Sequence, residues 1–218
     1  MQSYDHFCVF AGGDFSLSNF EQCVDRDNVD GYLAVDRGLE HCLAAGIVPT
    51  FLLGDFDSVS SMAINDARVS AVPRQAYPPD KDASDLELAL LWLERCAPRK
   101  VTLVGISGGR TDHMLFNWQL PLLKDWPFEI DLVDSSVYAS VVTPHRSLTI
   151  QARPGQQFSI LAMNSCYGLN VSGAEYPLQN ASLAYGSTRG LSNRVEGHTL
   201  DISLENGKCL VMLVNAHS

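Results

Sequence analysis

The chain has 218 residues, of which 46% are hydrophobic and 18% are charged, a composition typical of a folded globular protein and not of a disordered one. Its 25 acidic and 15 basic residues give a formal net charge of -10, which argues against nucleic acid or an anionic membrane as a partner. Residues 144–218 hold only four acids and five bases, so the negative charge is concentrated in residues 1–143.

Between residue 7 and about residue 134, short apolar runs alternate with helical patterns. Each run is followed at once by glycine or aspartate, and the runs are residues 7–10, 31–35, 51–53 and 101–104. Uninterrupted runs of this kind are typical of parallel strands that are buried on both faces. The clearest helical pattern covers residues 84–96. The alternation predicts an α/β domain with a Rossmann-like parallel sheet over residues 1–143.

After about residue 143 the pattern changes to short β segments that are separated by glycine and asparagine. These segments are residues 147–151, 157–162, 169–172, 194–196, 199–204 and 209–214. Asn206-Gly207 lies between the last two, and this dipeptide predicts a two-residue hairpin. No convincing helical pattern occurs here, so we expect an all-β domain, an antiparallel β-sandwich, over residues 144–218.

The six cysteines and the apolar runs bear on the cellular compartment. No two cysteines form a C-x-x-C pair, and several lie in apolar or helical segments, which favours buried, reduced thiols. The N-terminus lacks the pattern of a secretory signal, and no apolar run reaches the ~18–20 residues of a membrane span. We therefore expect a soluble cytoplasmic protein with no membrane partner.

Acidic residues gather where the predicted strands end. Asp14, Asp36, Asp55 and Asp57 each follow a strand, and a second acidic group, residues 80–87, precedes the predicted helix. Ligands of open α/β sheets bind at the carboxyl ends of the strands, so these carboxylates would repel one another across one cleft. A bound Mg²⁺ ion would relieve that repulsion. Alternatively, such turns serve only as helix caps.

Residues 105–113, with the sequence GISGGRTDH, join a predicted strand to a predicted helix. Their glycines would let backbone N–H groups face an anion at the helix N-terminus, and Arg110 would bind phosphate through two hydrogen bonds. The segment matches neither the P-loop nor the dinucleotide-binding fingerprint. A plain connection capped by Thr111 or Asp112 is the alternative, and His113 is either a general base or a structural hydrogen-bonding group.

These motifs, taken in order, resemble the thiamine pyrophosphokinase family of the bacterial type. The matching segments are Ala11-Gly12-Gly13, Ala34–Gly38, Gly46–Pro49, Gly54–Ser58, Asp80–Glu87, Gly108–His113 with Asn117, Tyr176–Leu178 and Gly190–Asn193. The chain departs from the pattern at Arg37, where many relatives have glycine, and at Ser84, where they have threonine. Neither change removes a candidate ligand, and the match is weaker after residue 143.

The resemblance implies a homodimeric enzyme with ATP and thiamine as its substrates. Each subunit would pair an α/β nucleotide domain with a β-sandwich, and thiamine would lie between one catalytic domain and the β-domain of the partner. The terminal diphosphoryl group of ATP would pass to the thiamine hydroxyl, which gives thiamine diphosphate and AMP. The alternatives are another Mg²⁺-dependent diphosphoryl or nucleotidyl transferase on the same scaffold, and a non-catalytic nucleotide or thiamine sensor.

The resemblance also implies roles for individual residues. Magnesium would be held by Asp55, Asp57 and Asp85, and the catalytic group would add Asp82 and Arg110 to these three. The nucleotide would lie near Asp36, Arg37, Lys81, Ser107, Gly108 and Gly109. Thiamine would contact Asp112, His113, Tyr176, Ser192 and Asn193.

Overall fold

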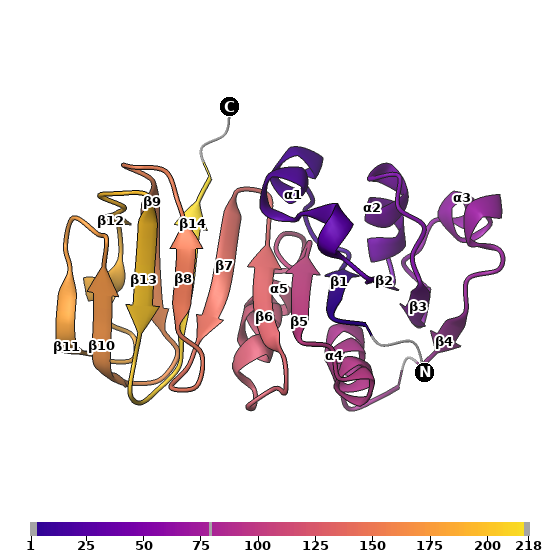
Figure 1. The fold of residues 1–218 in the computed structure, drawn as a ribbon. Coiled ribbons are helices and arrows are strands. Elements are labelled where there is room, and N and C mark those ends of the chain that lie inside the picture. Colours follow the sequence, from indigo (N-terminus) through magenta and orange to yellow (C-terminus); the bar gives the residue numbers. More distant parts are fainter. Residues whose placement is uncertain (1–3, 79, 216–218) are drawn as a thin grey trace. The chain divides into compact units, whose positions relative to one another are not determined.

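The computed structural model describes residues 4–78 and 80–215, which form two compact units that divide between Ser135 and Ser136 (Figure 1). The division precedes the boundary that we expected after residue 143. The reason is strand β7 (Val137–Val142), which pairs along its whole length with β14 (Cys209–Val214) in the second unit. Within these residues, no helix is long and apolar enough to cross a membrane.

The first unit contains a parallel sheet with the strand order β6-β5-β1-β2-β3-β4. Its strands are β1 (His6–Phe10), β2 (Gly31–Val35), β3 (Phe51–Gly54), β4 (Arg74–Ala76), β5 (Lys100–Val104) and β6 (Glu129–Val133). The four strands predicted from apolar runs are confirmed. Two more strands were not predicted, because β4 is wholly exposed and the sequence of β6 is interrupted by acids.

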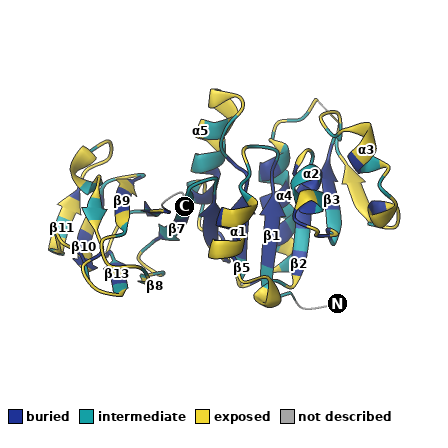
Figure 2. Cartoon of the chain, turned by 90° about the horizontal axis from the view of Figure 1, so that it is seen from above, coloured by how far each residue is buried: buried dark blue, intermediate teal, exposed yellow. Residues whose placement is uncertain are grey.

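The helices of this unit are α1 (Leu17–Cys23), α2 (Gly38–Ala44), α3 (Ser61–Ile64), α4 (Asp85–Cys96) and α5 (Thr111–Gln119). Helix α2 packs against β1 and β2, and α4 packs against β2 and β3. Helix α4 confirms the predicted helix, with Ser84 as its N-cap, since the Ser84 hydroxyl accepts a hydrogen bond from Glu87 N. Figure 2 shows buried residues along the central strands and exposed residues on the outer sides of the helices.

Strand β1 is the point at which the winding of the parallel sheet reverses. Its neighbours are β2 on one side and β5 on the other, so the turns that follow β1 and β5 lie side by side at the carboxyl edge. In open α/β sheets, ligands bind outside the carboxyl ends of the strands at such a reversal. The fold therefore places the glycine-rich segments 11–14 and 105–110 where a ligand is expected.

The second unit consists of antiparallel strands in the orders β12-β9-β14-β7 and β11-β10-β13-β8. Its remaining strands are β8 (Leu148–Gln151), β9 (Gln157–Ala162), β10 (Cys166–Ser172), β11 (Leu178–Leu183), β12 (Asn193–Arg194) and β13 (Thr199–Ser203). Buried residues of both groups of strands, such as Phe158 and Leu169, form one hydrophobic core. A parallel α/β unit followed by antiparallel β-structure is thus confirmed.

The hairpin predicted at Asn206-Gly207 is wrong. Strand β13 pairs with β8 and β10, whereas β14 pairs with β7 and β9, so this turn carries the chain from one group of strands to the other. Asn206 forms an antiparallel bridge with Tyr167 of β10 instead. The dipeptide marked a turn correctly, but a turn signal does not specify the partner of the strand that follows.

Candidate active site

Acidic residues and one lysine meet where β2 and β3 end and α4 begins. Asp36 follows β2, Asp55 and Asp57 follow β3, and Asp85 is the first residue of α4. Lys81 Nζ lies 3.0 Å from Asp85 Oδ2 and 3.7 Å from Asp55 Oδ2, and all three side chains are largely buried. Asp55 and Asp85, which are 30 residues apart in the chain, thus both pair with the ammonium group of Lys81.

The pKa values show that negative charge is in excess at this site. The pKa of Asp36 is raised to about 6, first by burial and then by the carboxylates of Asp85 and Asp55, against the lowering effect of the hydrogen bond from Phe56 N. The pKa of Asp57 is raised by its neighbour Asp55, whereas the pKa of Asp55 is lowered, first by the hydrogen bond from Asp57 N. One lysine therefore does not neutralise this group of carboxylates.

Two observations bear on whether these residues suit a divalent cation. Asp85 Oδ1 is buried and has no hydrogen-bond partner among the described residues, so an acceptor oxygen is left unsatisfied. Within the described part of the chain, however, no three acidic, histidine or cysteine side chains converge as a finished metal site. Asp57 and Asp82 are exposed. The donor chemistry fits Mg²⁺, but the structure assembles only part of the predicted ligand set.

The glycine-rich segments after β1 and β5 are joined by backbone hydrogen bonds. Gly13 N donates to Gly105 O at 2.8 Å, and Asp14 N donates to Ser107 O at 2.6 Å. Gly108 has φ 83°, and a Cβ atom there would overlap the carboxylate of Asp14. The glycine at this position is therefore required both by its backbone conformation and by the close approach of the neighbouring loop.

Arg110, Asp112 and His113 lie together at the start of α5, exposed to solvent. The guanidinium of Arg110 donates two hydrogen bonds to Asp112, at 3.2 and 2.6 Å, and this pairing holds the pKa of Asp112 at about 2. The N-cap of α5 is Arg110, with no side-chain cap. The alternative in which Thr111 or Asp112 caps the helix is therefore wrong, since Asp112 accepts from His113 N instead.

Three residues that sequence reasoning gave no role support the same loops. His41 Nε2 donates to Gly13 O at 2.8 Å, and its ring stacks on Phe15. Trp118 Nε1 donates to the Ser107 hydroxyl at 2.9 Å, and Asn117 Nδ2 donates to Ile106 O at 3.1 Å. Asn117 belonged to the matched motif, but its contact was not predicted. His41 carried no local signal, because its partner Gly13 follows another strand, and Trp118 carried none, because its partner Ser107 lies 11 residues earlier, before the helix begins.

In the second unit, Tyr176, Ser192 and Asn193 lie close together. The Asn193 amide donates to Tyr176 O at 2.9 Å and accepts from Tyr176 N at 3.1 Å, so it fixes the backbone on both sides of that tyrosine. Ser192 has φ 64°, and its N–H donates to the Ser159 hydroxyl. Tyr176 is 62% exposed and is not part of the hydrophobic core of this unit, so its ring is available to a ligand.

Comparisons with known proteins agree with this arrangement. Residues 26–126 match the thiamin pyrophosphokinase catalytic domain, and residues 147–209 match the thiamin pyrophosphokinase vitamin B1 binding domain. A thiamine pyrophosphokinase of Bacillus subtilis is 32% identical over 167 residues, which are 75% of this chain and 78% of that protein.

Solved structures with the same description are similar over nearly the whole chain. The crystal structure of thiamine pyrophosphokinase from Bacillus subtilis is 26% identical, with a TM-score of 0.83 over 97% of this chain and 100% of that one. The one from Geobacillus thermodenitrificans is also 26% identical, with a TM-score of 0.81 over 98% and 99% of the two chains. The resemblance found in the sequence is therefore confirmed, and the chain belongs to the thiamine pyrophosphokinase family of enzymes.

Proposed function

We propose that this enzyme uses Mg²⁺ to transfer the terminal diphosphoryl group of ATP to the hydroxyl of thiamine, which gives thiamine diphosphate and AMP. The observation that carries the proposal is the group formed by Asp55, Lys81 and Asp85 at the carboxyl edge of a parallel sheet. It combines an excess of carboxylates, which suits a divalent cation, with a lysine that suits phosphate oxygens.

The residues that would hold Mg²⁺ are Asp55, Asp57 and Asp85. The unpartnered, buried Oδ1 of Asp85 supports this assignment, because a cation would satisfy it. When bound, the ion would neutralise phosphate charge as it develops during the transfer. Lys81 would then pair with a phosphate oxygen, and Asp82 would lie close by at the exposed rim.

The nucleotide would lie at the carboxyl edge of the parallel sheet, beside strand β1, where the winding of the sheet reverses. Asp36 and Arg37 follow β2, and Gly12 lies directly against the Arg37 side chain, so this turn adjoins the loop after β1. Segment 107–109 would present its backbone N–H groups to phosphate oxygens, since Gly108 and Gly109 both have positive φ. Positioning and charge neutralisation are what diphosphoryl transfer requires, so no covalent nucleophile is needed.

Thiamine would be recognised by two sets of side chains. Arg110, Asp112 and His113 would face the thiamine and phosphate region, with the Asp112 carboxylate as acceptor for the aminopyrimidine. Tyr176, Ser192 and Asn193 of the second unit would contribute the other set, with the exposed Tyr176 ring as a face for the cationic substrate.

The finer features of the fold and assembly belong to the same proposal. The first unit would be a Rossmann-like nucleotide domain and the second a β-sandwich that takes part in dimerisation. The enzyme would act in the cytoplasm as a homodimer in which each site uses residues of both chains. The shared core of the second unit and the parallel strand order of the first support the two domain descriptions.

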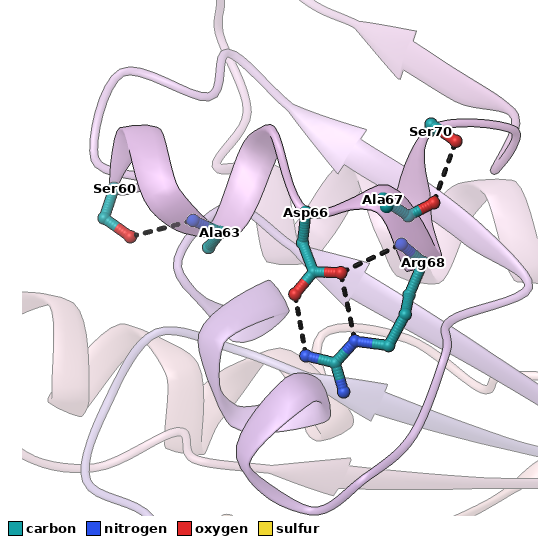
Figure 3. A network of polar contacts seen from close by, with 6 residues as sticks. All are labelled: Ser60, Ala63, Asp66, Ala67, Arg68 and Ser70. Atoms are coloured by element: carbon teal, nitrogen blue, oxygen red, sulfur yellow. Dashed lines mark hydrogen bonds and ion pairs between the residues drawn. The ribbon is translucent and has the colours of Figure 1, made fainter.

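The test is the release of AMP from ATP at limiting Mg²⁺, with thiamine present and absent. The wild-type enzyme should release AMP only with thiamine, and Asp57→Asn and Asp85→Asn should each lose about 10–100-fold or more in turnover. The control is Asp66→Asn, because Asp66 is bound to Arg68 outside this group, as Figure 3 shows. Near-normal turnover of both site variants would contradict the metal assignment.

A further inference from the structure

Asp36 and the turn Gly54–Asp57 are interlocked in an unusual conformation. Asp36 has φ 46°, Phe56 has φ 61° and Gly54 has φ 143°. Left-handed backbone conformations are unfavourable for residues other than glycine, and aspartate and asparagine tolerate them best. A phenylalanine in this region therefore requires a contact that holds it there.

The Asp36 carboxylate supplies that contact. Phe56 N donates to Asp36 Oδ1 at 3.1 Å, and Asp36 N donates to Leu53 O at 3.1 Å, so the two turns are tied in both directions. A Cβ atom added at Gly54 would overlap the same carboxylate. The Asp36 side chain thus occupies the space that the absence of a side chain at Gly54 leaves open.

Phe56 lies between the two aspartates that this turn contributes to the site. Asp55 Oδ1 accepts from Asp57 N at 3.2 Å, so the two residues also share a hydrogen bond across the turn. The turn is also held by backbone hydrogen bonds from Tyr77 N to Gly54 O and from Val59 N to Phe56 O, but Asp36 is the side chain that binds the backbone between the two aspartates.

We propose that Asp36 is a positioning residue, whose carboxylate holds the turn Gly54–Asp57 through Phe56 N–H and so orients Asp55 and Asp57. The nucleotide would then lie near Asp36, but the Asp36 carboxylate would affect nucleotide binding only indirectly, by orienting Asp55 and Asp57. The effect on magnesium requirement rests on the proposed function, whereas the effect on the turn does not.

Two variants separate positioning from direct contact. Asp36→Asn keeps an acceptor oxygen for Phe56 N–H and tolerates a positive φ, but it removes the charge. Asp36→Gly also tolerates the backbone conformation, but it removes the acceptor. The matched control is Asp66→Gly, because Asp66 likewise accepts a backbone N–H two residues on, from Arg68 at 2.9 Å, and lies outside the site.

The first measurement is amide hydrogen exchange, followed by mass spectrometry in peptides that cover residues 54–58, with no ligand added. Loss of one hydrogen bond should speed exchange there by about tenfold in Asp36→Gly. Asp36→Asn should stay within about twofold of wild type, and Asp66→Gly should leave these peptides unchanged. Unchanged exchange in Asp36→Gly would overturn the proposal, whether or not the enzyme makes thiamine diphosphate.

The second measurement is the Mg²⁺ concentration that gives half-maximal AMP release. It should rise about 10–100-fold in Asp36→Gly, rise by a clearly smaller factor in Asp36→Asn, and change little in Asp66→Gly. If Asp36→Asn keeps the turn protected but is as impaired as Asp36→Gly, the charge acts directly and positioning is wrong. If Asp36→Gly does not fold, Asp36→Asn is compared with the wild type instead, and exchange about tenfold faster at residues 54–58 in Asp36→Asn would overturn the proposal, because that variant keeps the acceptor for Phe56 N–H. A wild-type enzyme without activity would refute the proposed function and leave the exchange test intact.

Discussion

The replacement Tyr176→Ala tests how the second unit takes part in substrate binding. Tyr176 is 62% exposed, and its backbone N–H and carbonyl are both bound by the Asn193 amide. Truncation at this position should therefore leave the loop in place and change the free energy of unfolding by no more than about 0.5 kcal/mol. For a chain of this size, such a change corresponds to about 1–2 °C in Tm.

The effect on thiamine should be larger than the effect on stability. A cation against an aromatic face contributes about 0.5–2 kcal/mol, depending on how far both are removed from water. At ~1.4 kcal/mol per tenfold, the KM for thiamine should rise between about twofold and thirtyfold. The KM for ATP should stay within about twofold of wild type, because the proposed nucleotide residues belong to the first unit.

The assay is steady-state AMP release with each substrate varied in turn, together with a melting curve. Tyr176→Phe should keep the wild-type KM for thiamine, because the ring is retained and only the hydroxyl is lost. Tyr185→Ala is the matched control, since Tyr185 is a 70% exposed tyrosine of the same unit. A thiamine KM that does not change in Tyr176→Ala would refute the reasoning, and so would an equal rise in Tyr185→Ala.

Other parts of the chain give three further predictions. Gly108→Ala should lower turnover by up to about 100-fold, because the added Cβ would displace the loop, and wild-type turnover would show that the loop has no such role. The contribution of His6 to the free energy of unfolding should decrease as the pH is lowered from about 7.5 to about 5.5, since burial, assisted by the charge of Lys100, holds the pKa of folded His6 below 6.5 and this histidine binds more protons in the unfolded chain. Urea unfolding measured across this range should therefore show that the wild type loses more stability on acidification than a His6→Gln variant, and equal pH dependence of the two proteins would contradict this cause. An Asp57→Asn chain mixed with an Asn193→Ala chain should exceed the summed activities of both, whereas no gain after proven subunit exchange would argue against shared sites.

The central strands could be predicted from the sequence because strands buried on both faces consist of uninterrupted apolar residues. Strand β6 could not be predicted in the same way, since Glu129 and Asp131 interrupt its apolar run. Asp131 is nevertheless buried, and it pairs with Lys100 Nζ at 2.6 Å on the neighbouring strand β5. A buried aspartate can be predicted only when its ionic partner is known, and the partner of Asp131, Lys100, lies 31 positions earlier in the chain.

The candidate site could be predicted only at the level of which residues lie at the carboxyl edge. Acids that follow parallel strands must gather there, and the structure brings Asp36, Asp55 and Asp85 to that edge. Their individual contacts could not be predicted from the sequence. Lys81 pairs with two aspartates that are distant in the chain, and Phe56 adopts a left-handed backbone conformation that is unfavourable for phenylalanine. Contacts of this kind depend on the packing of turns against one another.

The ion pairs of Lys81 have a consequence for the order in which ligands enter. The ammonium group already serves as the counter-ion of Asp55 and Asp85, so a divalent ion that arrives alone would have to displace it without offering it a new partner. A triphosphate brings that partner, because its oxygens can accept the displaced ammonium group. On the proposed function, binding would be an exchange of ionic partners, in which cation and nucleotide each favour the entry of the other by the same coupling free energy. On the proposed function, such a site would bind magnesium together with a nucleotide more readily than magnesium alone.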